Sequence, residues 1–215
     1  MPQKRKPQTS PGPAFTESQP NDDFTLPAAL YYDAIYHFAN AVAADTTGDS
    51  QACDRLMRSS VLAAFSCFEA MLNQVAFAYA HTHRNQLGQI ELDVLEEMET
   101  TVDERGDIIR RNKFYKTEAR FTFLACFLSG KDFDRSSDLW QRFQAARELR
   151  DRWTHPKPPF DTWSLTLPDV HRAIAVVRDL FVKLDEMMGA DPRRWLRPID
   201  EILAEMSSAA QQPAV

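Results

Sequence analysis

The sequence has few cysteines, and none is placed as a metal or redox site requires. The chain carries three, Cys53, Cys67 and Cys126, which are odd in number, widely spaced and set in apolar sequence. A C-x-x-C pair is absent, so the pattern indicates free core thiols in a reducing, cytoplasmic compartment. No third ligand stands near His81 and His83 either. The sequence therefore predicts no metal site and no other cofactor.

Long hydrophobic runs are also missing. A bilayer-spanning helix needs about 20 consecutive apolar residues, whereas the longest run that stands out is FTFLACFL, from Phe121 to Leu128. The amino-terminal MPQKRKPQTSPGP begins with charge, but no apolar segment follows it as in a secretory signal. We therefore expect a soluble, cytoplasmic protein that does not interact with membranes.

An excess of positive charge is missing as well. Lys and Arg total 25 against 31 Asp and Glu, which leaves a net charge of −6. This balance excludes a protein that coats nucleic acid through bulk charge, but it is compatible with a local basic cleft.

The two ends of the chain differ in composition from its middle. Apolar residues make up 44% of the chain, which excludes wholesale disorder. Residues 1–24 are rich in Pro, Ser, Gln and charge and are predicted to form a disordered tail. Residues 191–215 are expected to hold a short helix and a loose tail. The folded domain is thus expected over residues 25–190.

Strand-like alternation is absent apart from a short extended connector, DTWSLTL, and the dominant apolar period is that of an α-helix. We predict five long helices. They cover about residues 25–44, a long stretch that follows the loop at Gly48 and ends near His81 and His83, then 116–129, 136–154 and 167–188. Residues 84–113 are predicted to be a charged, weakly patterned insertion. The fold class is all-α, a helical bundle.

Arg150 is the anomalous residue of the fourth predicted helix. On a helical wheel it falls inside the apolar stripe of Phe143, Ala146 and Trp153. A buried guanidinium needs a carboxylate, a phosphate or a ring of acceptors. Glu69, with Asn73 one turn later, is a candidate partner on the second helix. Two interpretations stay open: a structural ion pair, or a Glu69 that positions Arg150 while its remaining donors face a cleft.

His155 follows Arg150 at the end of the same helix. Pro156 disfavours helical backbone at His155, so the helix should end there, where its dipole favours an imidazolium. In an unbroken helix the side chains of Arg150 and His155 would point about 140° apart. A two-fold dimer that brings two helix ends together would make one cleft from both copies.

These residues resemble the signature of HEPN domains, in which an Arg, a polar residue, three variable residues and a His close a helix. The string LRDRWTHP places Arg150, Asp151 and His155 at that spacing, and FEAMLN, from Phe68 to Asn73, resembles the family's second helix. Asp151 replaces the commoner Asn. No Tyr follows His155 at short spacing, unlike in the toxins that a nucleotidyltransferase inactivates.

The resemblance implies a five-helix, up-and-down HEPN-like bundle and a metal-independent endoribonuclease that acts as a homodimer. It implies a toxin or anti-phage defence effector, with RNA as substrate and an antitoxin or regulatory protein as a further partner. The implied catalytic residues are Arg150, Asp151 and His155, supported by Glu69 and Asn73. Neighbouring bases expected to bind RNA are Arg147, Arg152 and Lys157.

The residue types suit RNA cleavage by the substrate's own 2′-hydroxyl. Histidine exchanges protons near neutral pH, and arginine offers a planar, bidentate clamp for phosphate oxygens. The alternative is a non-catalytic HEPN-like dimeric module that binds a nucleotide, RNA or a protein partner. A DNA-binding helical protein is disfavoured, because the basic residues do not lie along one exposed recognition helix.

Overall fold

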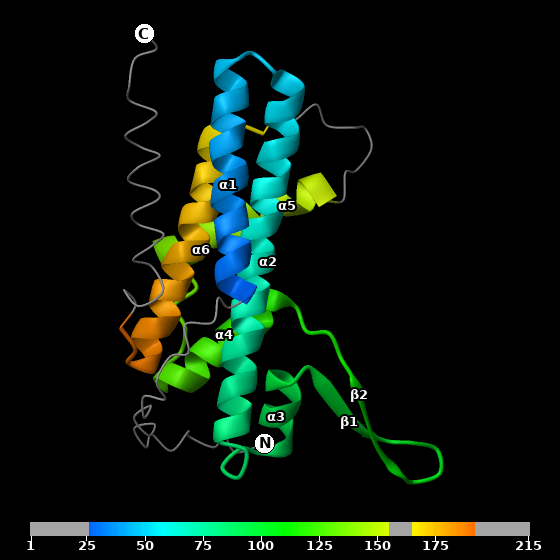
Figure 1. The fold of residues 1–215 in the computed structure, drawn as a ribbon. Coiled ribbons are helices and arrows are strands. Elements are labelled where there is room, and N and C mark those ends of the chain that lie inside the picture. The colour runs from blue at the N-terminus through cyan, green and yellow to red at the C-terminus, as the bar shows by residue number, and fades with distance from the viewer. Residues whose placement is uncertain (1–25, 155–164, 192–215) are drawn as a thin grey trace. The chain divides into compact units, whose positions relative to one another are not determined.

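A computed structural model of the chain describes residues 26–154 and 165–191. These residues form six α-helices and one two-stranded sheet (Figure 1). The elements are, in chain order, α1 (Leu26–Thr46), α2 (Ser50–Thr82), α3 (Gln89–Leu95), β1 (Met98–Val102), β2 (Ile108–Asn112), α4 (Thr117–Ser129), α5 (Asp138–Thr154) and α6 (Leu167–Met188). The predominantly helical class is confirmed. The arrangement of five helices as an up-and-down HEPN-like bundle stays a prediction.

Several sequence predictions fall outside the described residues. They concern the tail at residues 1–24, the short helix and tail expected up to residue 215, most of the connector DTWSLTL, and the side chains of His155 and Lys157.

The expectation that the chain holds no strands before the connector was wrong in one place. Residues 84–113, predicted as a weakly patterned insertion, contain α3 and the antiparallel hairpin of β1 and β2. All five residues of β2 are exposed, and β1 is only partly buried. A strand that buries neither face shows no apolar alternation, so the usual sequence signal is missing.

The described residues divide into two compact units. The bundle unit comprises residues 26–68, 134–154, 165–186 and 190–191, and therefore contains α1, the first part of α2, α5 and most of α6. The hairpin unit comprises Glu69–Phe133 and Met187–Gly189, and contains the second part of α2, α3, both strands and α4.

Aromatic side chains from α2, α5 and α6 form the core of the bundle unit. Phe68 is fully buried; its ring centroid lies 5.0 Å from that of Phe143 on α5 and 6.4 Å from that of Phe181 on α6. Tyr31 of α1 packs on Phe181 and donates its hydroxyl to the backbone carbonyl of Ile174 at 3.5 Å. These contacts hold α1 and α2 alongside α6 (Figure 1).

The cysteines agree in part with the expected core thiols. All three are free; Cys53 and Cys67 are buried, and Cys126 is half-buried. The Cys67 thiol donates to the backbone carbonyl of Pro27 at 2.9 Å, and burial raises the pKa of Cys67 to about 12. This thiol is therefore protonated near neutral pH and contributes packing rather than reactivity.

Side-chain hydrogen bonds and a glycine cap the ends of three helices. Thr166 and Asp169 form a reciprocal box before α6, because each backbone N–H is bonded by the other's side chain. Ser137 accepts from the backbone N–H of Trp140 at the start of α5. Gly130 follows α4 with φ 64°, the left-handed conformation that glycine adopts readily.

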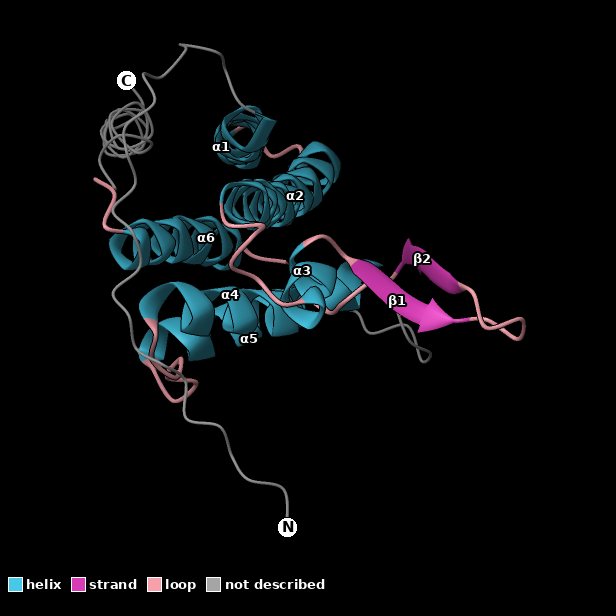
Figure 2. Cartoon of the chain, turned by 90° about the horizontal axis from the view of Figure 1, so that it is seen from below, coloured by secondary structure: helices cyan, strands magenta, loops and turns pink. Residues whose placement is uncertain are grey.

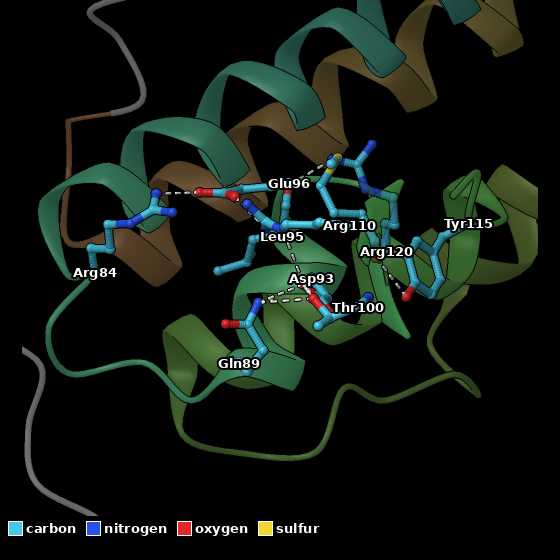
Figure 3. A network of polar contacts seen from close by, with 10 residues as sticks. Arg84, Gln89, Asp93, Leu95, Glu96, Thr100, Arg110, Tyr115 and Arg120 are labelled. Atoms are coloured by element: carbon cyan, nitrogen blue, oxygen red, sulfur yellow. Dashed lines mark hydrogen bonds and ion pairs between the residues drawn. The ribbon is translucent and has the colours of Figure 1, made fainter. Parts of the chain in front are cut away.

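Asp93 joins α3 to the hairpin. One carboxylate oxygen accepts from the backbone N–H of Thr100 at 3.0 Å, and the other accepts from Gln89 Nε2 and Thr100 Oγ1 at 2.8 and 3.1 Å (Figure 3). Burial alone would raise the pKa of Asp93, but these hydrogen bonds and the charge of Arg110 lower it. The hairpin extends away from α3 beyond this attachment (Figure 2).

By length and composition alone, α2 is apolar enough to cross a membrane, and 44% of its most apolar window is buried inside the structure. The polar residues Glu69, Asn73 and Gln74 interrupt this apolar stretch, so it does not stand out as one run in the sequence. Core helices of soluble proteins satisfy the same test, and α2 supplies Phe65 and Phe68 to the bundle core. The absence of membrane interaction stays a prediction.

Candidate functional site

The last two turns of α5 place Arg150 against the bundle core. Phe143 and Ala146 are buried on the same face, two turns and one turn earlier, respectively. The Arg150 side chain is 26% exposed, and its Cζ lies 5.1 Å from the ring centroid of Phe65 on α2. This geometry is a cation–π contact. The predicted position of Arg150 within the apolar stripe is therefore confirmed.

Asp151 binds the side chain of Arg150. Its Oδ1 atom accepts from Arg150 Nε at 2.9 Å and from Nη2 at 2.7 Å. Its Oδ2 atom lies 3.8 Å from the Nε of Arg147, one turn earlier on α5. Asp151 thus lies between Arg150 and Arg147, and all three residues were predicted to act on RNA. The edge of the Arg150 guanidinium formed by Nε and Nη2, which suits bidentate binding of a phosphate, is occupied by Asp151.

The predicted supporting residues, Glu69 and Asn73, belong to the hairpin unit, whereas Arg150 belongs to the bundle unit. Glu69 is exposed and accepts a long hydrogen bond from Thr117 Oγ1 at 3.4 Å. Asn73 accepts a short hydrogen bond through Oδ1 from Arg120 Nη1 of α4. The ion pair between Glu69 and Arg150 stays a prediction. Arg120, a partner of Asn73, was not anticipated from the sequence.

The carboxyl end of α5 leads directly to the predicted catalytic histidine. Thr154, the last residue of the helix, donates its hydroxyl to the backbone carbonyls of Arg150 and Asp151 at 3.1 and 3.4 Å. A threonine in a helix commonly bonds back in this way to the carbonyls three and four residues earlier. His155 and Lys157 follow outside the described residues, and Arg152 is exposed.

Arg58 is a basic residue near this end of α5 that the sequence reasoning missed. It is exposed on α2, and its Cζ lies 5.6 Å from the ring centroid of Trp153. The sequence held a signal for this position, because Arg58 precedes Phe65 by two helical turns and both residues therefore share a face of α2. Arg58 and Phe65 each form a cation–π contact with a residue of the last α5 turn.

Within residues 26–154 and 165–191, no group of three His, Cys, Asp or Glu side chains is placed to hold a metal ion. The chemical resources at the end of α5 are therefore guanidinium groups from Arg58, Arg147, Arg150 and Arg152, with Asp151 among them. Such an array can bind and orient an anion, but proton transfer near neutral pH needs a further group.

Comparison with known proteins returns no relative. No protein-family model, no curated protein and no solved structure matches this chain.

Proposed function

We propose that this protein is a metal-independent endoribonuclease of the HEPN type, cleaving RNA at a dimeric site built from Arg150 and His155. A toxin or anti-phage defence effector is the role that the sequence resemblance favours. The observation that carries the proposal is the half-buried Arg150, which contacts Phe65 and Asp151 in the last turn of α5. The motif histidine follows five positions later in the sequence.

Arg150 is suited to bind a phosphate because its guanidinium is already oriented. Packing on Phe65 and bonding to Asp151 limit its rotamers before any ligand arrives. A pre-oriented group loses less side-chain entropy on binding and stabilises developing charge without reorganisation. Arg58, Arg147 and Arg152 add positive charge around the same helix end, which gives an acidic protein a local basic surface.

In the proposed reaction the 2′-oxygen of one ribose attacks the adjacent phosphorus. One His155 accepts the 2′-hydroxyl proton, the bond between phosphorus and the 5′-oxygen breaks, and the second His155 of the dimer protonates the leaving oxygen. The products are a 2′,3′-cyclic phosphate and a 5′-hydroxyl. Two Arg150 guanidiniums stabilise the additional negative charge of the transition state.

The test is cleavage of RNA by purified full-length protein in EDTA, with the product ends mapped. Arg150→Ala should reduce the rate about 10² to 10³-fold, and His155→Ala about 10² to 10⁴-fold. Arg178→Ala is a matched control, because Arg178 also donates Nε and Nη2 to the carboxylate of the following residue, Asp179, at 3.2 and 3.0 Å. Equal cleavage by wild type and both motif variants would refute the proposed site.

A non-catalytic HEPN-like module that binds a nucleotide, RNA or a protein partner is the second candidate. The bonding of Asp151 to the Nε and Nη2 edge of Arg150 favours it, because a phosphate would have to displace that carboxylate. Under this alternative, wild type and His155→Ala bind RNA equally well and neither produces cyclic phosphate ends. Expression of both proteins in bacteria, with growth and RNA ends recorded, separates the two candidates.

A further inference from the structure

The hairpin unit contains a cavity of about 320 Å³ that lies outside the α5 site. The end of α2, the end of α3 and both strands contribute its lining. The lining residues are Phe77, His81, Arg84, Glu96, Met98 and Arg110. Its volume falls at the lower end of the range for small-molecule pockets, about 300 to 1,000 Å³.

Glu96 binds two arginines at this cavity. One carboxylate oxygen lies 2.7 Å from Arg84 Nη1 and the other lies 2.6 Å from Arg110 Nη2 (Figure 3). Arg110 Nε also lies 3.4 Å from the buried Asp93. The Arg84 side chain is 54% exposed, and within the described residues its other N–H groups form no hydrogen bond. Glu96 therefore orients two guanidiniums and leaves donors available to an anion.

An exposed aromatic ring lies at the same cavity. Phe77 is 64% exposed, which is a large apolar exposure for a ring on a core helix. His81 follows Phe77 by one turn on α2, so the ring and the imidazole share a face of the helix. Arg84 lies two residues beyond the end of α2 and lines the same cavity. A planar ligand can stack on Phe77 while its anionic group reaches Arg84.

We propose that this cavity binds one nucleotide, with the base stacked on Phe77 and the phosphate on Arg84 and Arg110. Glu96 and Asp93 hold these two guanidiniums in place, and the phosphate binds to the N–H donors that the carboxylates do not use. The same chemistry is offered by a free mononucleotide and by one unit of single-stranded RNA. This site does not depend on cleavage at the α5 end.

Binding to full-length protein tests the proposal with two probes that the protein cannot cleave. The first is AMP or GMP, measured by calorimetry. The second is a short, fluorescently labelled 2′-O-methyl RNA, measured by anisotropy; it lacks the 2′-hydroxyl nucleophile. Phe77→Ala and Arg84→Ala should each weaken the binding about fivefold or more, which is the scale of a lost base–aromatic stack.

The chain offers a matched control for each variant. Arg111 is 64% exposed and pairs with Glu99, which keeps Lys113 as a second partner, just as Glu96 keeps Arg110 when Arg84 is removed. Phe114 is 90% exposed and does not line the cavity. Arg111→Ala and Phe114→Ala should change the affinity less than about twofold, as for ordinary surface substitutions.

The two probes identify the source of the nucleotide. Sensitivity of AMP or GMP binding to the cavity variants indicates a free nucleotide, and sensitivity of RNA binding alone indicates a single strand. Either result supports the site. Absence of saturable binding by both probes overturns the proposal, as does binding that Phe77→Ala and Arg84→Ala leave unchanged. A protein that fails to cleave RNA can still pass this test, so the two proposals fail separately.

Discussion

Substitution of Arg120 by leucine should destabilise the hairpin unit strongly. Among the described residues Arg120 is the only buried arginine; its side chain is 8% exposed. It bonds Asn73 through Nη1 and the backbone carbonyl of Leu95 through Nη2 at 3.2 Å, and lies 3.1 Å from Glu97. Burial lowers the pKa of Arg120, against the pull of the Glu97 and Glu69 charges. It therefore connects α4 to α2 and to the end of α3.

The magnitude follows from the partners that leucine leaves behind. A buried polar group without a partner costs about 1 to 3 kcal/mol. Breaking one side of a buried ion pair costs about 3 to 5 kcal/mol. Because Glu97 is 28% exposed and can be hydrated, we expect the lower part of that range, about 3 kcal/mol. For a chain of this size the melting temperature should fall by about 6 to 12 °C.

The measurement is thermal and urea unfolding followed by far-ultraviolet circular dichroism. Arg111→Leu is the control, since Arg111 is 64% exposed and a surface ion pair contributes about 0 to 1 kcal/mol. Some buried ion pairs can be replaced by apolar residues of similar volume without loss of stability, and if that held here Arg120→Leu would be neutral or stabilising. An Arg120→Leu protein as stable as wild type would therefore refute this account of how the hairpin unit is held together.

Three further predictions concern the bundle unit. Asp151→Asn should increase RNA affinity about two- to fivefold, because it removes the partly exposed carboxylate charge that a phosphate would otherwise have to displace from Arg150. An inactive variant with unchanged binding would assign the carboxylate a catalytic role. Arg58→Ala should reduce the salt dependence of RNA binding by about one in slope, whereas Arg55→Ala, an exposed arginine on the same helix, should not. Asp169 has a pKa lowered chiefly by the Thr166 hydroxyl, so its stabilising effect is present above the unfolded carboxyl pKa and is lost as the pH falls through the lowered value. Melting curves of wild type and Asp169→Asn should accordingly differ at neutral pH and converge as the pH falls below the unfolded carboxyl pKa of about 3.9.

A helix boundary was predictable where a strong local signal marked it. Gly130 follows α4 because a left-handed residue satisfies the helix end, and the Thr166–Asp169 box starts α6 at the expected position. The helical apolar period of α2 places Phe65 and Phe68 on one stripe, and both are buried. These signals are local, so they do not depend on which elements become neighbours.

The hairpin was not predictable by the same means. Its strands are stabilised by charged cross-strand contacts, such as Glu99 with Arg111 and Lys113, and by the attachment of Asp93 to Thr100. In the sequence these acids and bases appear as two solvated runs of opposite charge. Cross-strand pairing depends on the register of the two strands, which an apolar pattern normally sets. This exposed hairpin has no such apolar pattern.

The two arginines of interest show why a helical wheel locates a buried charge better than it names its partner. The wheel placed Arg150 toward the core from angular position alone, and Phe65 does lie beneath its guanidinium. The choice of Asn73 as its support depends on which helix packs there and stays a prediction, and the Asn73 amide oxygen accepts a hydrogen bond from Arg120. Arg120 escaped notice because its helix, TEARFTFLACFLS, is apolar on most sides and has no stripe against which a charge stands out. The hydrogen-bond partner of a polar residue on α2 is thus decided by tertiary packing, which a helical wheel does not contain.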